Sequence, residues 1–281
     1  MASFTTRPMS LFEIQTAVGW AANEGWNPGF ADAVCFAATD PEGFIGGFLD
    51  GEMVASISVV NYDDAFAFLG FYIVPPAHRG QGWGLKLWQA AIGHAGSRLI
   101  GLDGVPDQQE NYWRSGFKLA YRNIRYGGPA PGAAPMTPGY ELVGAGEVSR
   151  EALHAYDRRC FPAPRPAFLD AWLSAPGHQG RVLVANGELA GYGVVRRCRE
   201  GAKIGPLFAD DPRAARHLFL ALTGLVGGEV FLDVPEANPA AVALAESFAL
   251  TPSFETARMY TGPAPQVALE CIFGVSSFEL G

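Results

Sequence analysis

The chain has 281 residues, of which 49% are apolar and 17% charged, and it carries a formal net charge of −8 with a pI near 5.1. This composition is typical of a soluble globular protein long enough for two domains, and the acidic balance argues against a nucleic-acid partner, whose binding surface is normally basic. The longest apolar run, around residues 66–74, is far shorter than the ~20 residues of a membrane span. The N-terminus also lacks an apolar core of the signal-peptide type, so we expect a cytoplasmic protein without a membrane partner.

The four cysteines lie far apart in the sequence and show no paired spacing; they are Cys35, Cys160, Cys198 and Cys271. Zinc sites and disulfide frameworks place their cysteines at characteristic short intervals. We therefore expect buried thiols in a reducing compartment and no bound metal.

The first half of the sequence predicts a mixture of strands and helices. Apolar residues recur at helical spacing over residues 11–24, with Ser10 as the N-cap and Gly25 at the end. Residues 43–60 predict two strands joined at Asp50-Gly51, because this pair tolerates the positive φ values of a tight hairpin turn. The later elements expected in this half are a buried strand over 65–74, a helix over 85–98, a strand over 99–105, a short helix over 107–116 and a strand over 117–126.

Proline, glycine and alanine dominate residues 127–141, so no periodic structure is predicted there. We expect a first domain over residues 1–127, a linker over 128–140 and a second domain over 141–281. The second half then repeats the order of the first, with helices over 149–160 and 166–173, a hairpin over 180–197, a strand over 203–209, a helix over 212–226, a strand over 228–234 and a further short helix. This repetition indicates a duplicated α/β fold with mixed central sheets flanked by helices.

Three glycines at alternate positions, Gly80, Gly82 and Gly84, stand between a buried strand and the start of a helix. A helix N-terminus has unpaired backbone N–H groups and a partial positive charge, and glycines let an anion approach them closely. Arg79 lies beside these donors. The segment therefore predicts an anion site, and a pyrophosphate is the anion that fits it best.

Two common nucleotide-binding loops fit this segment poorly. A P-loop requires Gly-Lys followed by Ser or Thr, whereas Gly84 is followed by Leu85 and Lys86. A dinucleotide-binding loop requires a third glycine or alanine three residues after the second, where Leu85 or Leu87 stands, although Asp103 lies at a suitable distance beyond. The first possibility is excluded and the second is weak.

Two motifs that follow each other along the chain indicate a third kind of anion-binding loop. A strand ends in Val74-Pro75-Pro76 and is followed by Arg79, Gly82 and Gly84, and further along Tyr112 precedes Gly116-Phe117 by four residues. With these motifs the first half resembles the GNAT family of acyl-CoA N-acyltransferases.

This resemblance implies acetyl-CoA as co-substrate, held largely by the backbone. Its pyrophosphate would be bound by Arg79 and by the N–H groups of Gly80, Gln81, Gly82, Trp83, Gly84 and Leu85. The strand end, made by Tyr72, Ile73 and Val74, would hold the pantetheine and polarise the thioester carbonyl, an effect worth a few kcal/mol of barrier. Tyr112 would donate a proton to the leaving thiolate.

The resemblance leaves two roles open. Val105 stands where the family often has an asparagine, so the contact to the pantetheine is either absent or supplied by Asp107 or Gln108. The base that deprotonates the attacking amine is Asp103, Glu24 or a chain of water molecules. Candidate residues for binding the acceptor are Trp26, Asn27 and Tyr126.

Over nearly its full length the chain resembles the YitH-like group, in which a GNAT domain is joined to a second GNAT-like domain. The segments that carry this likeness include residues 24–29, 203–210, 257–262 and 273–281. The second half has no alternating glycines before its helix, and Ala245 stands where the tyrosine would be. We therefore expect a degenerate second domain and one active site per chain.

The function expected from these features is N-acetyl transfer from acetyl-CoA to a primary amine of a small molecule, by direct attack. Two alternatives stay open: a noncatalytic sensor of acyl-CoA, and an N-acetyltransferase that modifies proteins. The sequence indicates neither the acceptor amine nor the oligomeric state.

Overall fold

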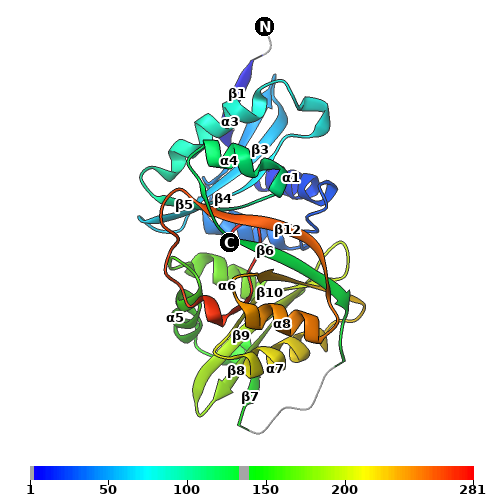
Figure 1. The fold of residues 1–281 in the computed structure, drawn as a ribbon. Helices are drawn as coiled ribbons and strands as arrows, with labels where there is room; N and C mark the ends of the chain where they lie inside the picture. The colour runs from blue at the N-terminus through cyan, green and yellow to red at the C-terminus, as the bar shows by residue number, and fades with distance from the viewer. Residues whose placement is uncertain (1–2, 133–138) are drawn as a thin grey trace.

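The computed structural model describes residues 3–132 and 139–281, so part of the predicted linker, residues 133–138, lies outside the described residues. The described strands form one continuous sheet in the order β1-β2-β3-β4-β5-β12-β6-β11-β10-β9-β8-β7, and β13 pairs with β10 off this path. Helices flank the sheet in both halves of the elongated molecule (Figure 1). The predicted class, a mixed α/β fold built from two similar halves, is confirmed.

The first half follows the sequence prediction closely. Ser10 caps the first helix through a capping box with Glu13, and the hairpin turn places Asp50 at φ 49° and Gly51 at φ 91°. The strand at the N-terminus and the second helix were not predicted. The elements are β1 (Phe4–Pro8), α1 (Leu11–Asn23), α2 (Asp32–Thr39), β2 (Phe44–Leu49), β3 (Glu52–Asn61), β4 (Phe66–Ile73), α3 (Trp83–Ala91), β5 (Leu99–Gly104), α4 (Gln109–Arg114) and β6 (Lys118–Pro129).

The second half repeats this order with differences near its end. Its predicted hairpin turns at Asn186 and Gly187, both with positive φ. The elements are β7 (Glu141–Gly144), α5 (Arg150–Cys160), α6 (Pro166–Ser174), β8 (His178–Ala185), β9 (Glu188–Arg197), β10 (Ala202–Ala209), α7 (Pro212–Thr223), β11 (Glu229–Pro235), α8 (Pro239–Ser247), β12 (Thr251–Tyr260) and β13 (Ile272–Gly274).

The two halves exchange strands at the middle of the sheet. β12, from the second half, lies between β5 and β6, and β6, from the first half, lies between β12 and β11. All of these contacts are antiparallel, as in the pairing of Leu232 with Tyr126 and of Tyr260 with Gly101. The sheet therefore continues across residue 127, where we placed the end of the first domain, and the second half supplies a strand beside β5 (Figure 1).

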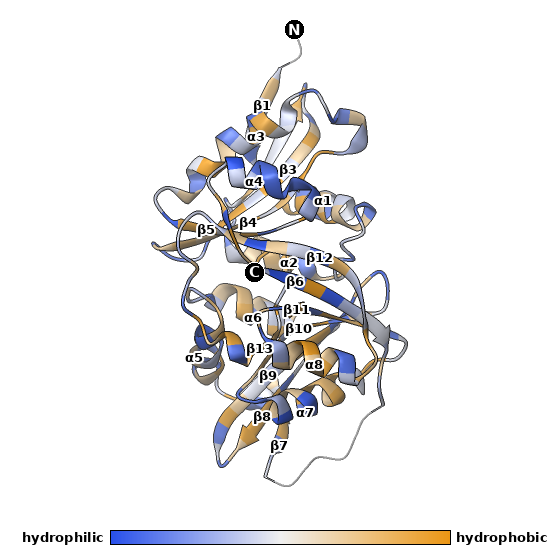
Figure 2. Cartoon of the chain, viewed as in Figure 1, coloured by the Kyte–Doolittle hydropathy of each residue, from blue (hydrophilic) through white to orange (hydrophobic). Residues whose placement is uncertain are grey.

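Apolar packing also joins the halves. One buried cluster combines Phe36, Phe44 and Phe71 of the first half with Phe168 and Trp172 of the second. The rings of Phe36 and Trp172 stack with their centroids 6.0 Å apart. Figure 2 shows apolar residues along β3 and hydrophilic residues along α4, as expected for a buried strand and a surface helix.

The burial predicted for the cysteines is confirmed, because all four are buried, and each is a free thiol. No helix in the described parts of the chain is long and apolar enough to cross a membrane.

Candidate active site

The candidate site lies where β4 and β5 separate. The two strands pair in parallel from Phe66 and Leu99 to Leu69 and Leu102, and β4 then stays with β3 through the pairing of Ser56 with Ile73. At this point Phe71 adopts φ 47°, a left-handed conformation that is unusual for a residue other than glycine. The Ser56 hydroxyl donates a hydrogen bond of 2.9 Å to the Phe71 carbonyl and helps to hold it there.

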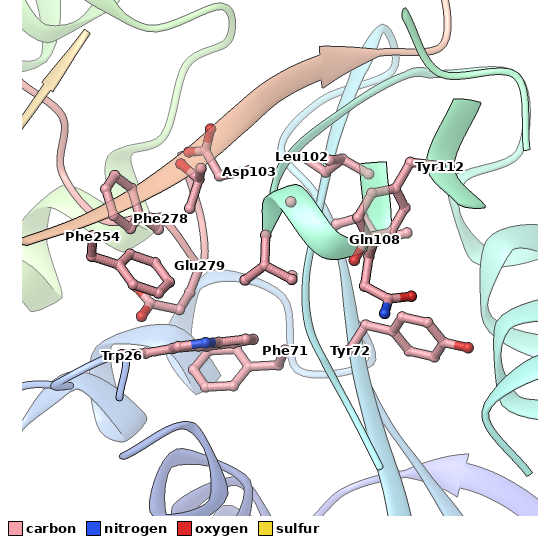
Figure 3. Close-up of a pocket in the computed structure, with 15 residues that line it drawn as sticks. Trp26, Phe71, Tyr72, Leu102, Asp103, Gln108, Tyr112, Phe254, Phe278 and Glu279 are labelled. Carbon is pink, nitrogen blue, oxygen red and sulfur yellow. The ribbon is translucent and has the colours of Figure 1, made fainter. Parts of the chain in front are cut away.

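Two adjoining cavities fill the opening between the strands. The inner cavity is narrow, with a volume of about 60 Å³, and the outer cleft has a volume of about 570 Å³. Five residues line both of them, namely Trp26, Tyr72, Val105, Gln108 and Phe254. Figure 3 shows the inner cavity with Tyr72 and Tyr112 toward one end and Trp26 and Phe254 toward the other.

The glycine segment forms an uncapped helix N-terminus next to the outer cleft. Gly80 and Gly82 have φ values of 74° and 82°, and no side chain caps α3. Gly84 allows a close approach, because a Cβ at this position would lie 2.8 Å from the Tyr72 hydroxyl oxygen. The backbone donors at the start of α3 therefore have no side-chain cap, as an anion site would need, and the pyrophosphate site stays a prediction.

Arg79 and Glu24 form an ion pair beside the outer cleft. Arg79 also donates a hydrogen bond of 2.7 Å from Nε to the Val74 carbonyl, which holds it at the end of β4. Both side chains are partly exposed, so the pair itself contributes little stability. Arg79 is thus positioned near the anion site, while the carboxylate of Glu24 is engaged by a cation.

Trp83, the first residue of α3, lies away from the cleft. Its ring stacks on Phe4 of β1 with a centroid distance of 5.0 Å, and the ammonium group of Lys86 lies 4.6 Å above it. We therefore expect Trp83 to contribute its backbone N–H to the anion site and its ring to packing.

Tyr112 lies on α4 and lines the inner cavity. Its ring packs against Trp88 and Phe117, at centroid distances of 5.9 and 6.3 Å. Gly104 faces this ring so closely that a Cβ there would lie 2.4 Å from it. Burial raises the pKa of Tyr112, so the phenol is protonated at neutral pH and is able to act as an acid.

Asp103 also lines the inner cavity, but its carboxylate is fully engaged. The guanidinium of Arg258 on β12 binds both oxygens, at 2.7 and 2.6 Å, and Asn123 donates a hydrogen bond of 2.8 Å. The pair is buried, with side-chain exposures of 0% for Asp103 and 6% for Arg258. This arrangement favours a role in joining β5 to β12 over a role as proton acceptor.

The three residues predicted to bind the acceptor lie in different environments. Trp26 lines both cavities. Asn27 instead exchanges two hydrogen bonds, of 2.8 and 3.0 Å, with the backbone of Glu200. Tyr126 is buried in the apolar core of the second half, where it packs in a cluster with Leu232. Neither Asn27 nor Tyr126 lines one of the two cavities, and both lie at contacts between the halves.

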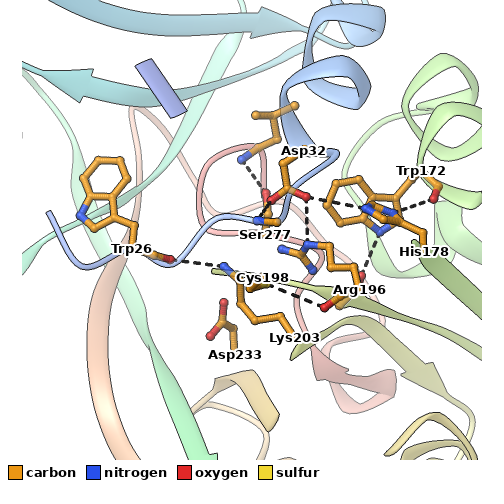
Figure 4. A network of polar contacts seen from close by, with 12 residues as sticks. Trp26, Asp32, Trp172, His178, Arg196, Cys198, Lys203, Asp233 and Ser277 are labelled. Atoms are coloured by element: carbon orange, nitrogen blue, oxygen red, sulfur yellow. Dashed lines mark hydrogen bonds and ion pairs between the residues drawn. The ribbon is translucent and has the colours of Figure 1, made fainter. Parts of the chain in front are cut away.

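A buried network fixes the position of Trp26 (Figure 4). The Trp26 carbonyl accepts hydrogen bonds from Arg125 at 2.9 Å and from Lys203 at 3.3 Å. Arg125 is in turn bound to both oxygens of Asp233, at 2.7 and 2.8 Å. Side chains of β6, β10 and β11 thus hold the loop that follows α1.

Four residues of the second half line the inner cavity and were not predicted from the sequence: Phe254, Thr256, Phe278 and Glu279. They come from β12 and from the segment after β13, more than 140 positions from Tyr112 along the chain. Gly70 of β4 is an indirect sign in the sequence that another segment packs here, because a Cβ at this position would lie 2.1 Å from the Glu279 carbonyl oxygen. A glycine in a buried strand often marks such a close backbone approach.

We expect Gly70→Ala to lower the free energy of unfolding by about 1–3 kcal/mol, since the added methyl group must displace backbone atoms. Urea denaturation followed by fluorescence measures this change. Gly93→Ala is the matched control, because a Cβ at Gly93 meets no atom within 4 Å. Equal stability of the two variants would show that residues 278–280 are not held against β4.

The corresponding places in the second half are occupied by the chain itself. Asp211 caps α7, and one of its carboxylate oxygens accepts hydrogen bonds of 2.8 Å from the N–H groups of Arg213 and Ala214. β10 and β11 also diverge, after Ile204, but β13 pairs with β10 at Leu207 and Phe208. The Asp211 carboxylate therefore lies at the start of α7, where an anion would otherwise bind, and β13 fills the opening between β10 and β11.

Two family models match the chain. The model of the acetyltransferase (GNAT) family covers residues 10–117, and a second acetyltransferase (GNAT) domain model covers residues 153–274. A curated relative, the holothin acyltransferase of Pseudoalteromonas sp. (strain SANK 73390), is 34% identical over 281 residues, which cover 99% of this chain and 95% of that protein.

Solved structures share the fold. A protein from Pyrococcus horikoshii assigned as an acetyltransferase has a TM-score of 0.82 at 22% identity, covering 99% of this chain and 96% of its own. A tandem GNAT protein from the clavulanic acid biosynthesis pathway has a TM-score of 0.65 at 17% identity, covering 93% of this chain and 100% of its own. The arrangement of two GNAT units in one chain is therefore found in other proteins.

Proposed function

Since the chain belongs to the GNAT family of acetyltransferases and is an acyltransferase, we propose that it transfers an acetyl group from acetyl-CoA to a primary amine of a small molecule by direct attack. The observation that carries this proposal is the uncapped, glycine-rich N-terminus of α3 beside the opening between β4 and β5. A site that transfers an acyl group from CoA needs donors for the pyrophosphate and a cleft that leads from them to an acid for the leaving thiolate.

In this proposal the backbone from Gly80 to Leu85 and the side chain of Arg79 bind the pyrophosphate. The end of β4, from Tyr72 to Val74, lies along the outer cleft and binds the pantetheine arm. Gln108 lines both cavities and is the residue best placed to replace the missing asparagine contact. Tyr112 at the inner cavity protonates the thiolate as it leaves.

We propose a single acetyl-CoA site per chain. The cap that Asp211 forms on α7 satisfies the donors that a second pyrophosphate would need, and its negative charge repels one. β13 occupies the opening beside β10, and Ala245 provides no acid. The second half instead supplies β12 and four residues of the inner cavity.

Two features support a small acceptor over a protein chain. The inner cavity is narrow and is lined largely by aromatic rings, including Trp26, Phe254 and Phe278. The curated relative is named for holothin, so acyl transfer to a named acceptor has been assigned to a protein that is similar over nearly the full chain. A noncatalytic sensor of acyl-CoA would not need Tyr112 in this cavity.

A calorimetric titration of acetyl-CoA into the purified protein tests this proposal. We expect one site per chain in the wild type and a roughly 10- to 100-fold loss of affinity in Gly82→Asp, because the new carboxylate repels the pyrophosphate at close range. Gly82→Asn is the matched control, since asparagine tolerates the φ of 82° as aspartate does but adds no charge.

The acetyl-CoA affinities of Gly82→Asp and Gly82→Asn should differ less as the salt concentration rises, because salt screens the added charge. Two sites per chain would refute the proposal that the second half is inactive. Equal affinity of Gly82→Asp and the wild type would place the pyrophosphate elsewhere.

A further inference from the structure

Glu279 lines the inner cavity, and its carboxylate is buried. The residue is 2% exposed, and neither of its carboxylate oxygens has a hydrogen-bond partner among the described residues. An unpaired buried carboxylate is costly, and native proteins rarely keep one without a function. Glu279 is one of the residues that line the inner cavity, so a molecule bound there would lie beside it.

The backbone around Glu279 is firmly held, so this side chain is not the loose end of a tail. The Glu279 carbonyl oxygen lies against Gly70 of β4. The next residue, Leu280, is buried, and its carbonyl accepts a hydrogen bond of 2.7 Å from the Tyr62 hydroxyl. The backbone of Glu279 is therefore held beside the point where β4 and β5 separate.

Buried acidic and basic side chains surround Glu279. Three buried cations of the second half and of β6 interact with it electrostatically, namely Arg125, Arg196 and Lys203. Two other buried carboxylates belong to this cluster: Asp233 is bound to Arg125 and Asp32 to Arg196. Glu279 is the third carboxylate, and of the three it is the one whose oxygens are left without hydrogen bonds.

Aromatic rings surround the carboxylate on two sides. Trp26 and Phe71 form one pair, with a centroid distance of 6.4 Å, and Phe254 and Phe278 form the other, at 6.1 Å. In Figure 3 the side chain of Glu279 lies between these two pairs. A carboxylate beside aromatic faces is a favourable environment for an organic cation with a flat apolar body.

We propose that Glu279 is the catalytic base, that it receives the ammonium group of the acceptor, and that the acceptor is a primary amine carried on an aromatic or other flat apolar body. This proposal rests on the function proposed above. It assigns the base to the second half of the chain, in place of Asp103 or Glu24, whose carboxylates are bound to Arg258 and Arg79.

Glu279 takes one proton from the ammonium group, and the neutral amine attacks the thioester carbonyl carbon and forms the C–N bond. The C–S bond breaks with its electron pair on sulfur, which takes the phenolic proton of Tyr112. The amine nitrogen loses a second proton as the amide forms; this proton restores Tyr112 through solvent, and Glu279 releases its own proton to solvent.

The first test compares two acceptors with acetyl-CoA at pH 7.5, phenethylamine, which is a cation, and phenylhydrazine, which is uncharged. In Glu279→Gln we expect kcat/KM to fall about 10²-fold or more for phenethylamine, the usual contribution of a general base, and less than about 10-fold for phenylhydrazine. Glu270→Gln is the control, because Glu270 is an exposed glutamate in the same part of the chain. An equal loss for both acceptors, or no loss, would overturn the proposal.

The second test needs no turnover. Phenethylammonium is titrated into the protein saturated with CoA, and we expect binding to the wild type and to Glu270→Gln but loss of binding in Glu279→Gln. Absence of binding to the wild type would overturn the proposed acceptor class. Titration of acetyl-CoA into Glu279→Gln reports whether this variant is folded and separates the two proposals, because the acetyl-CoA site does not include Glu279.

Discussion

Replacing Tyr112 by phenylalanine is expected to lower kcat for amine acetylation by ~10²- to 10⁴-fold and to leave the affinity for acetyl-CoA unchanged. The substitution removes the phenolic proton but keeps the ring, which packs against Trp88 and Phe117. Burial raises the pKa of this phenol above the ordinary tyrosine value of about 10, so the wild-type acid stays protonated at neutral and mildly alkaline pH. Steady-state kinetics and calorimetry on the same preparation measure the two quantities.

Tyr72→Phe is the matched control for this prediction, because Tyr72 is the second tyrosine in the inner cavity. We expect Tyr72→Phe to keep most of the turnover, since the backbone of this residue, and not its hydroxyl, is proposed to act. A large loss of kcat in Tyr72→Phe together with normal kcat in Tyr112→Phe would show that the acid is Tyr72 and not Tyr112. Acetyl-CoA binding without turnover of any amine by the wild type would favour the sensor.

The features that sequence analysis predicted depend on residues close together in the chain. Ser10 caps the helix that begins at the next residue, and Asp50-Gly51 forms the turn between adjacent strands. The glycines from Gly80 to Gly84 precede the helix whose donors they expose. Because backbone conformation is set by such short-range effects, these parts of the fold and the uncapped start of α3 were predictable.

The features that were missed depend on contacts between distant segments. No periodicity in the sequence shows that β12 lies between β5 and β6, since the exchange is a property of the sheet and not of either strand. Glu279 enters the site for the same reason. Sequence analysis placed a carboxylate, Asp103, at the end of β5, but its partner Arg258 comes from the other half of the chain and changes its expected role.

Asp103→Asn is expected to lower the free energy of unfolding by about 3–5 kcal/mol, because it leaves the guanidinium of Arg258 buried without a counter-charge. Asp103 and Arg258 lie directly opposite each other on β5 and β12, so the pair joins strands of the two halves. Arg258→Met should cost a similar amount, since it leaves the Asp103 carboxylate uncompensated. Urea denaturation of both single variants measures these losses.

The double variant Asp103→Asn/Arg258→Met separates a structural role from a catalytic one. Removing both charges leaves neither group uncompensated, so we expect the double variant to be more stable than either single variant. A double-mutant cycle should then give a coupling energy of several kcal/mol between Asp103 and Arg258. If Asp103 only joins the strands, the double variant keeps most of its kcat for amine acetylation. If Asp103 were the base, the double variant would regain stability but not activity. Its kcat would then stay low for phenethylamine, which must lose a proton, but not for phenylhydrazine. The same pair of acceptors thus distinguishes Asp103 from Glu279 as the group that removes the proton from the acceptor.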